Sequence, residues 1–279
     1  MTGARMARHP AALISGGATL LGESTVDCLI SDGFHVAIAD VDVANGQRIA
    51  SEHGDQCFFI AIDVTNESSV SEGVVNAAEQ LGSLDVLVNM AATYLDPGLD
   101  ADAAAWIYSL QVNVIGAALM VKYSRPYLAQ SDRASIVNVG SVSADRAQPG
   151  KLLYPAGKAA VAQLTRNLAL DLAAEGIRVN SVSPSWIWSA PIKARSGDNL
   201  ALADEVAKSF HILNRLGRPS DIAFGISFLC SERAAFITGE NLHIDGGYLA
   251  LSPEGKVNPW VARERRLSIN SPGSTGDAG

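Results

Sequence analysis

A-A-L-I-S-G-G-A-T-L-L-G, residues 11–22, joins a short apolar run to a pair of glycines and the start of a helical pattern. An unbroken apolar run of this length is typical of a strand that is buried on both faces. The glycines that follow it indicate a tight turn, and the pattern after them predicts a helix to about residue 30. This stretch therefore predicts the first strand–turn–helix unit of an α/β fold.

Six further apolar runs alternate with helical patterns along the chain. The runs are 35–39, 57–62, 84–89, 135–139, 177–182 and 241–245, and the helical patterns are 43–53, 67–81, 101–123, the segment containing 154–158, 199–211 and 219–231. Seven apolar strands with intervening helices indicate a parallel sheet covered on both faces. We predict one doubly wound Rossmann-type α/β domain over residues 10–250, with an N-terminal tail at 1–9 and a partly flexible extension at 251–279.

The composition argues against several classes of partner. The 279 residues carry a net charge of −8, and no stripe of lysine and arginine suggests a nucleic-acid surface. Three scattered cysteines, Cys28, Cys57 and Cys230, each lie in an apolar run, which argues against disulfides and a zinc site. The five histidines show no ligand spacing, so we expect no metal.

Residues 103–121 contain no charged side chain and are long enough to suggest a membrane span. However, the stretch contains Ser109, Gln111 and Asn113, and unsatisfied polar groups are costly in lipid. We interpret it as a core helix that also packs against another subunit. We therefore expect a cytoplasmic protein without a membrane partner.

An aspartate at the end of the second strand strengthens the interpretation of the glycine turn. Glycines after a first strand allow close approach of a pyrophosphate, and the next helix N-terminus favours its charge. Asp40 follows Gly22 by 18 residues, and no lysine or arginine comes directly after it. An acid at this place can accept hydrogen bonds from an adenosine ribose and repels a 2′-phosphate, which favours NAD over NADP. A solvated loop aspartate is the alternative.

The segment Y-P-A-G-K, residues 154–158, places a phenol and an ammonium one helical turn apart. A free phenol has a pKa of about 10 and is a poor base at neutral pH. A nearby ammonium, or the charge of an oxidised nicotinamide, favours the phenolate. We therefore expect Tyr154 to exchange a proton with an alcohol or a carbonyl, with Lys158 lowering its pKa.

Tyr-x-x-x-Lys, preceded by a serine thirteen residues earlier, resembles the short-chain dehydrogenase/reductase superfamily, in its large subgroup of about 250 residues. The serine is Ser141, and the segment Q-V-N-V-I-G-A supplies Asn113, the matching asparagine. The resemblance extends to residues 178–184, 216–223 and 237–247. It implies that Ser141 polarises the substrate oxygen, Tyr154 is the acid/base, Lys158 tunes it and also reaches the nicotinamide ribose, and Asn113 supports a proton relay.

The same resemblance implies a set of cofactor-binding residues. They are Ser15, Gly16, Thr19, Leu20, Leu21, Gly22, Asp40, Val41, Asp63, Val64, Asn89, Met90, Ala91, Tyr154, Lys158, Pro184, Ile187 and Ser189. Three places depart from the family pattern. In the glycine turn Ser15 replaces a threonine and Leu20 replaces a glycine. N-M-A-A at 89–92 replaces N-N-A-G, and Ser185 follows Pro184 where a glycine is usual. A leucine at 20 puts a side chain near the pyrophosphate path and excludes a positive φ without strain.

Candidate substrate contacts lie beyond the carboxyl ends of the strands, where ligands bind in this architecture. They are Tyr94, Ser143, Trp186 and Trp188. The alternative for both tryptophans is packing of the loop or of a subunit contact. The mostly apolar pocket walls favour a hydrophobic or ring-bearing secondary alcohol or ketone.

The leading hypothesis is an NAD-dependent secondary-alcohol dehydrogenase or carbonyl reductase. A dehydrogenase of cyclic diols or hydroxysteroids, with the same machinery, is the alternative within the enzyme class. A weakly catalytic dinucleotide-binding regulatory protein is the alternative from another class, motivated by the altered glycine turn and by N-M-A-A. The family resemblance also implies a homotetramer.

Overall fold

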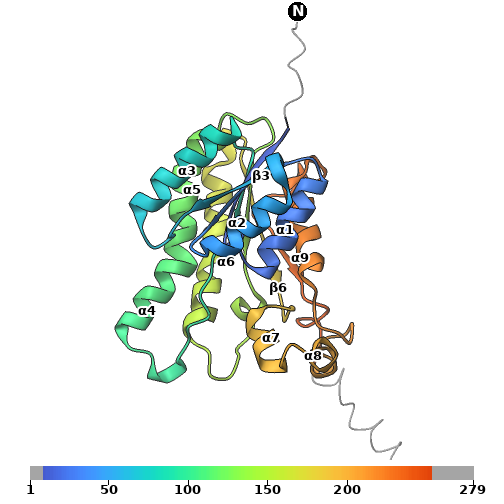
Figure 1. Ribbon diagram of the computed structural model, residues 1–279. Coiled ribbons are helices and arrows are strands. Elements are labelled where there is room, and N and C mark those ends of the chain that lie inside the picture. Colours follow the sequence, from blue (N-terminus) through green and yellow to red (C-terminus); the bar gives the residue numbers. More distant parts are fainter. Residues whose placement is uncertain (1–8, 253–279) are drawn as a thin grey trace, which may run out of the picture.

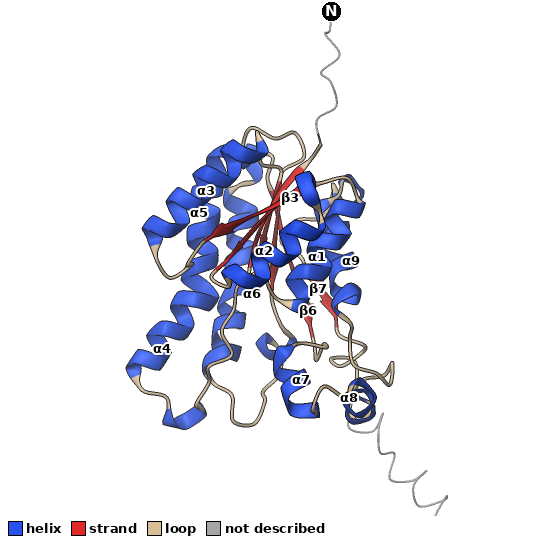
Figure 2. Cartoon of the chain, in the orientation of Figure 1, coloured by secondary structure: helices blue, strands red, loops and turns tan. Residues whose placement is uncertain are grey.

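A sheet of seven parallel strands, in the order β3-β2-β1-β4-β5-β6-β7, forms the centre of the fold. Figure 2 shows the strands in red between the surrounding helices. The computed structural model describes residues 9–252; the terminal segments predicted as a tail and an extension lie almost entirely outside them. The strands are β1 (Ala11–Ser15), β2 (His35–Asp40), β3 (Cys57–Ala61), β4 (Val86–Asn89), β5 (Ser135–Val139), β6 (Arg178–Pro184) and β7 (Asn241–Ile244). The predicted doubly wound fold is confirmed.

Helices cover both faces of this sheet (Figure 1). They are α1 (Leu20–Ser31), α2 (Val43–Glu52), α3 (Glu67–Leu81), α4 (Ala103–Leu110), α5 (Gly116–Leu128), α6 (Leu153–Asp171), α7 (Ala190–Ser196), α8 (Leu200–Ala207) and α9 (Pro219–Cys230). Helices α1, α2 and α9 pack on one face and α3, α5 and α6 on the other.

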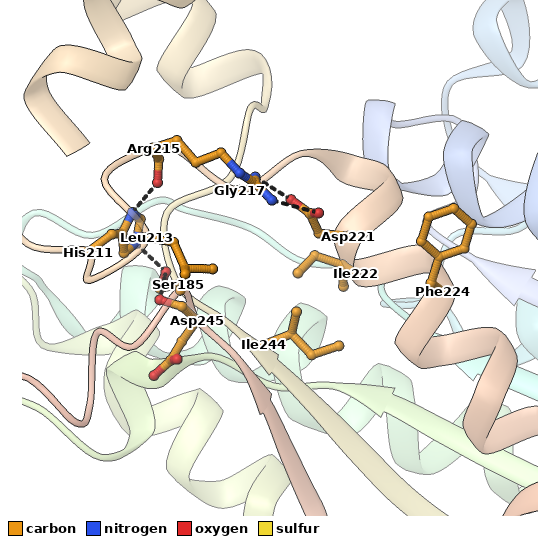
Figure 3. A pocket seen from close by; sticks show the side chains of 11 residues that line it. Ser185, His211, Leu213, Arg215, Gly217, Asp221, Ile222, Phe224, Ile244 and Asp245 are labelled. Atoms are coloured by element: carbon orange, nitrogen blue, oxygen red, sulfur yellow. Dashed lines mark hydrogen bonds and ion pairs between the residues drawn. The ribbon is translucent and has the colours of Figure 1, made fainter. Parts of the chain in front are cut away.

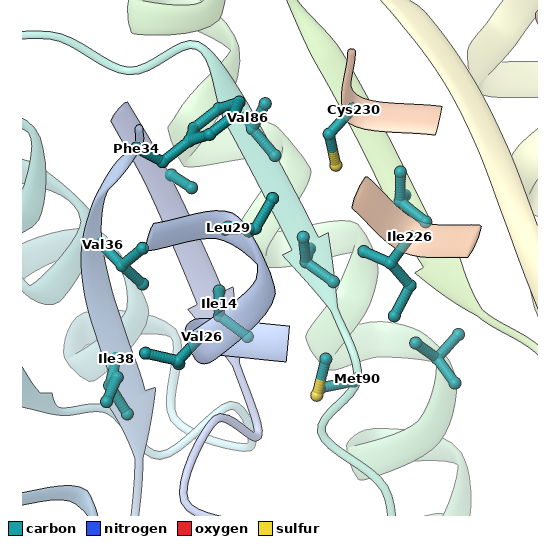
Figure 4. Packing of buried hydrophobic residues seen from close by; sticks show 14 of the residues in the cluster. Ile14, Val26, Leu29, Phe34, Val36, Ile38, Val86, Met90, Ile226 and Cys230 are labelled. Carbon is teal, nitrogen blue, oxygen red and sulfur yellow. The ribbon is translucent and has the colours of Figure 1, made fainter. Parts of the chain in front are cut away.

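The apolar periodicity of the helices explains the two layers. On one face Val26 and Leu29 of α1 and Ile226 of α9 meet the strand residues Ile14 and Val86 (Figure 4). A second buried cluster joins the opposite face of the sheet to α3, α5 and α6. Burial of both faces accounts for strands that read as continuous apolar runs rather than alternating ones.

Strand β1 determines where the site lies. It pairs with β2 on one side and with β4 on the other, so the strand order reverses between β1 and β4. The segments after β1 and β4 therefore leave the sheet in different directions at its carboxyl edge. This divergence opens a crevice, the usual ligand position in a doubly wound fold.

Two elements differ from the sequence expectation. The predicted helix at 101–123 consists of α4, a π-helical segment (Gln111–Ile115) and α5, which extends to Leu128. The stretch after β6, expected to be irregular, contains α7. The Pro191 near its start and the left-handed Gly197 after its end were the available signals for a short helix.

The continuous helical run Ala103–Leu128 is long and apolar enough to cross a membrane by length and composition alone, and it is the only such helix in the described residues. One such helix is weak evidence for a membrane protein, because a helix of a soluble protein can pass the same test. About a third of its most apolar window is buried within the protomer, so it is less enclosed than a core helix.

Candidate active site

A cleft of about 1180 Å³ lies at the carboxyl edge of the sheet. Segments that follow β1 to β6 line it, together with residues from the first two turns of α1, α2 and α6 and from α7. Its volume exceeds the usual range for a small ligand. The cleft can therefore hold an extended molecule with a second, smaller one beside it.

The glycine turn forms one wall of the cleft. Gly16 has a φ of +76°, and a Cβ at this position would lie 2.6 Å from the Ala91 nitrogen. A Cβ on Gly22 would lie 2.4 Å from the Gly17 carbonyl oxygen. Thr19 caps α1, because its side chain accepts a hydrogen bond from the Gly22 N–H at 3.1 Å. The turn thus presents the N-terminus of α1 to the cleft, a favourable position for a pyrophosphate.

The departures from the family pattern change the cleft surface without straining the backbone. Leu20 is the first residue of α1, and it is not among the described non-glycine residues with positive φ. The conflict expected between this leucine and a left-handed backbone is therefore not found. The side chains of Leu20 and Met90 both line the cleft, and the Met90 N–H donates to the Ser15 carbonyl oxygen at 3.0 Å.

Asp40 is held at the end of β2 by two backbone donors. Its Oδ2 accepts from the Ala18 N–H and its Oδ1 from the Asp42 N–H, each at 3.0 Å. Each carboxylate oxygen keeps acceptor capacity for a further hydroxyl. The glycine cradle, the α1 N-terminus and this fixed carboxylate together fit a nicotinamide dinucleotide with its adenosine beside Asp40.

Helix α6 carries Tyr154 and Lys158 into the other end of the cleft. Asp96, in the loop after β4, accepts from the backbone N–H groups of Leu152 and Tyr154 at 3.0 Å and so holds the start of this helix. Lys158 is only 3% exposed. Its Nζ donates to the Val139 carbonyl oxygen at 2.7 Å and lies 5.6 Å from the centre of the Tyr154 ring.

Burial dominates the proton affinities of this pair. It lowers the pKa of Lys158 to about 8. Burial, followed by the neighbouring Tyr94 hydroxyl, raises the pKa of Tyr154 well above 10, and the Ser141 hydroxyl acts in the opposite direction. Burial therefore sets the direction of the Tyr154 pKa shift in the protein alone, and the lowering expected from the Lys158 charge is not among its causes.

Two polar groups complete the surroundings of Tyr154. Ser141 Oγ contacts Ser143 Oγ at 3.1 Å, and Ser143 Oγ donates to Gln148 Oε1 at 3.0 Å. Asn113 lies in the π-helical segment and does not line the cleft. Its amide instead pairs with the backbone of Thr93, accepting from the N–H at 3.1 Å and donating to the carbonyl at 3.2 Å. Asn113 therefore positions the segment that carries Tyr94, and π-helical distortions often occur at such sites.

Most residues predicted from the sequence meet in this one cleft. Those that line it are Gly16, Thr19, Leu20, Leu21, Asp40, Val41, Asp63, Val64, Met90, Ala91, Tyr94, Ser141, Ser143, Tyr154, Lys158, Pro184, Trp186, Ile187 and Ser189. Ser15, Gly22, Asn89, Asn113 and Trp188 are outside the lining. Asn89, for example, donates its side-chain amide to Asn138 Oδ1 at 3.0 Å beneath the cleft floor.

Both predicted tryptophans pack on the small apolar cluster of α8, but only Trp186 also lines the cleft. The Trp186 ring is tilted against that of Phe210, with 4.9 Å between the ring centres. Trp188 lies under the Lys193 ammonium. Loop packing, the alternative given above, therefore describes Trp188. Tyr94 is 54% exposed, and its ring lies 5.0 Å from that of Tyr154, measured between centres.

Several polar residues of the cleft were not anticipated from the sequence. Glu23, Asn45, Arg48, Lys151 and Arg195 all line it. They lie within helices or in a loop of no recognisable motif, so no local pattern marks them. Only the three-residue spacing of Asn45 and Arg48, on the cleft side of α2, offered a signal.

A smaller cavity of about 210 Å³ lies behind the loop that follows β6 (Figure 3). Ser185 borders both this cavity and the main cleft. Its Oγ lies 2.5 Å from Nε2 of the buried His211, whose Nδ1 lies 2.7 Å from the Arg215 carbonyl oxygen. These contacts fix the loop that carries Trp186.

Comparisons with known proteins establish the family of the chain. A family model described as enoyl-(acyl carrier protein) reductase matches residues 17–249. Cis-4-hydroxycyclohexanecarboxylate dehydrogenase of Sinomonas cyclohexanicum is 36% identical, with 86% of this chain and 96% of the relative covered. The 2,5-dichloro-2,5-cyclohexadiene-1,4-diol dehydrogenase of Sphingobium indicum is 31% identical, with coverage of 86% and 96%. The solved structure of ElxO with NADP bound has a TM-score of 0.79 and 30% identity, and 87% of this chain and 100% of that one are covered.

The chain belongs to the short-chain dehydrogenase/reductase superfamily, as its fold, motif order and relatives show. It is an alcohol-type oxidoreductase with a nicotinamide dinucleotide as cofactor. Within residues 9–252, no group of three or more histidine, cysteine, aspartate or glutamate side chains could hold a metal ion.

Proposed function

We propose that this chain is an NAD-dependent dehydrogenase of cyclic secondary alcohols, which also reduces the corresponding ketones. One observation carries the proposal: Tyr154, Lys158 and Ser141 meet at one end of a cleft whose other end holds the Asp40 carboxylate. The carboxylate supports NAD because it can accept from two ribose hydroxyls and repels a phosphate.

The reaction needs a hydride acceptor and a proton acceptor. The nicotinamide supplies hydride chemistry when it is bound. Ser141 holds the substrate oxygen through its hydroxyl, and Tyr154 takes the alcohol proton as the carbinol C–H bond breaks. In the reverse direction Tyr154 returns this proton to the carbonyl oxygen. Lys158 favours the phenolate by its charge when it is protonated.

The raised pKa of Tyr154 affects whether alcohol oxidation or ketone reduction is favoured at a given pH. At neutral pH the phenol keeps its proton, which is the form that donates to a carbonyl. Alcohol oxidation needs the deprotonated phenol, so we expect its rate to rise as the pH increases.

Two features support a ring-bearing substrate. Tyr94 and Trp186 place aromatic surfaces on the cleft walls, and the Tyr94 ring lies next to that of Tyr154. Two of the relatives, by their names, are dehydrogenases of a hydroxycyclohexane carboxylate and of a cyclohexadiene diol. A flat or puckered six-membered ring is therefore the substrate shape that we propose.

The test is the appearance of NADH absorbance with NAD and a panel of cyclohexanols, cyclic diols and linear secondary alcohols, with a parallel NADP series. We expect turnover with NAD, a preference for rings, and loss of at least a thousandfold in kcat for Tyr154→Phe, in which NADH still binds. Tyr123→Phe removes a phenol on α5 that contacts Glu67, outside the cleft, and is the matched control. NADH binding without turnover of any alcohol would favour the regulatory alternative.

A further inference from the structure

The wall of the cleft around Asp40 is strongly acidic. Glu23 from α1, Asp40 from β2 and Asp42 before α2 all line it. Arg48 is the only lysine or arginine among the described cleft residues contributed by α1, β2 and α2. A guanidinium at this place is noteworthy because arginine recognises phosphate with two parallel hydrogen bonds.

The Glu23 carboxylate forms an ion pair with this guanidinium. Arg48 Nη1 donates to Glu23 Oε1 at 2.9 Å and Nη2 donates to Glu23 Oε2 at 3.1 Å. Nη1 also donates to Glu52 Oε1 at 2.9 Å. The forked contact with Glu23 uses both terminal nitrogens, which are the atoms that would hold a phosphate.

The arrangement of α2 brings Arg48 to the cleft. Asp42 caps this helix and its carboxylate accepts from both the backbone and the side chain of Asn45. Asn45 and Arg48 are three residues apart and so lie on one face of the helix, the face that lines the cleft. Glu52 is one turn further along α2 and does not line the cleft.

We propose that Glu23 is a specificity-determining residue that holds Arg48 and so denies the cleft a phosphate-binding guanidinium. Discrimination against a 2′-phosphate then has two parts: Asp40 repels the phosphate, and Glu23 removes the cation that would attract it. This inference rests on the proposed binding of a dinucleotide with its adenosine beside Asp40.

Because both parts act on the same phosphate, the effects of substitutions at Asp40 and Glu23 on NADPH affinity should not be additive. Removing the charge of Asp40 alone leaves Arg48 held by Glu23. Removing the charge of Glu23 alone frees Arg48 but leaves the repulsion from Asp40. Only the double change removes both the forked contact on Arg48 and the Asp40 carboxylate, leaving Nη2 available to a phosphate while Nη1 keeps its contact with Glu52, so the two substitutions should be coupled.

The experiment measures affinity for NADPH and NADH by fluorescence titration at fixed ionic strength, with Glu23→Gln, Asp40→Asn and the double variant. Asparagine keeps an oxygen for the Ala18 N–H. We expect the double variant to gain at least about tenfold more NADPH affinity than the product of the two single gains. Adding Arg48→Gln should abolish this excess.

Glu52→Gln is the matched control, because it removes a carboxylate on Arg48 that lies off the cleft. We expect no gain in NADPH affinity from it, alone or with Asp40→Asn. Gains that simply multiply, or that persist after Arg48→Gln, would overturn the inference while NADH binding by the wild type still supports the proposed function. Absence of NADH binding by the wild type would overturn both.

Discussion

At Lys158 burial favours the neutral amine, whereas the proposed role in catalysis needs the charged ammonium. The ammonium is almost fully enclosed, and it donates a hydrogen bond to the neutral Val139 carbonyl. Taking a charge out of water costs free energy, and the lowered pKa of about 8 expresses that cost. The residue is kept charged near neutral pH at the expense of stability, as is common where catalysis needs an unfavourable group.

The pH dependence of stability tests this balance through Lys158→Met. The unfolded chain keeps the lysine proton to about pH 10.5, whereas the folded chain releases it near pH 8. Between these values the unfolded state binds more protons, so the free energy of unfolding of the wild type rises with pH. Relative to the variant, we expect a rise of roughly 3 kcal/mol across this window.

Urea denaturation of both proteins at several pH values measures the difference. The lost partner of the Val139 carbonyl shifts the difference by a constant and leaves its pH dependence intact. A difference that does not change with pH would show that Lys158 is not desolvated as described.

Among the elements, helix α6 depends on a residue from a distant loop. Leu152 precedes the helix and has no capping side chain, so the first N–H groups need acceptors from elsewhere. Asp96 provides them, and it is 58 residues away in sequence from Tyr154. Burial raises the pKa of Asp96, but these backbone donors outweigh it and the net pKa is lowered.

Asp96→Ala should therefore affect both stability and catalysis. We expect the free energy of unfolding to fall by about 1 kcal/mol, the usual effect of losing an N-terminal cap. We also expect kcat/KM to fall, because the backbone of Tyr154 loses its anchor. Asp96→Asn keeps one acceptor oxygen, so its free energy of unfolding and its kcat/KM should lie between those of the wild type and of Asp96→Ala. Asp100→Ala, at an exposed position of the same loop, is the control; equal effects from both alanine variants would contradict the capping role.

For the whole molecule, the uncharged helical run at 103–121 exposes large apolar side chains that nothing within residues 9–252 of the protomer covers. Ile107 is 58% exposed and Ile115 is 49% exposed on its outer side. Apolar side chains in such a patch usually mark a contact between proteins. We propose that this surface packs on a second copy within a homotetramer, as the superfamily resemblance implies.

The assembly prediction is tested with Ile107→Glu combined with Ile115→Glu. We expect the wild type to sediment as a tetramer and the double variant as smaller species, because two buried carboxylates per subunit are costly. Val75→Glu places the same charge on α3, away from this surface, and should keep the tetramer. A monomeric wild type would refute the prediction directly.

Much of the fold and of the candidate site could be predicted from local pattern. Continuous apolar runs indicate buried parallel strands, and Gly16, Asp40, Ser141 and Tyr154 each lie at a strand end or a helix start. In a parallel sheet these ends meet at one edge, so residues far apart in sequence could be assigned to one cleft. The π-helical segment and α7 were not predicted, because short or distorted helices show little hydrophobic periodicity.

The sequence by itself determined the class of fold through its apolar periodicity and the superfamily through the resemblance of its motifs, and it predicted the residues of the reacting centre. Only the tertiary structure decided that Glu23 holds Arg48, that Asp96 caps α6 and that Trp186 lines the cleft while Trp188 does not. It also decided how deeply Tyr154 is buried, and this burial raises the pKa of the phenol, whereas the sequence analysis expected the Lys158 charge to lower it. Desolvation and long-range pairing arise only when distant segments are packed together, and no local pattern records them.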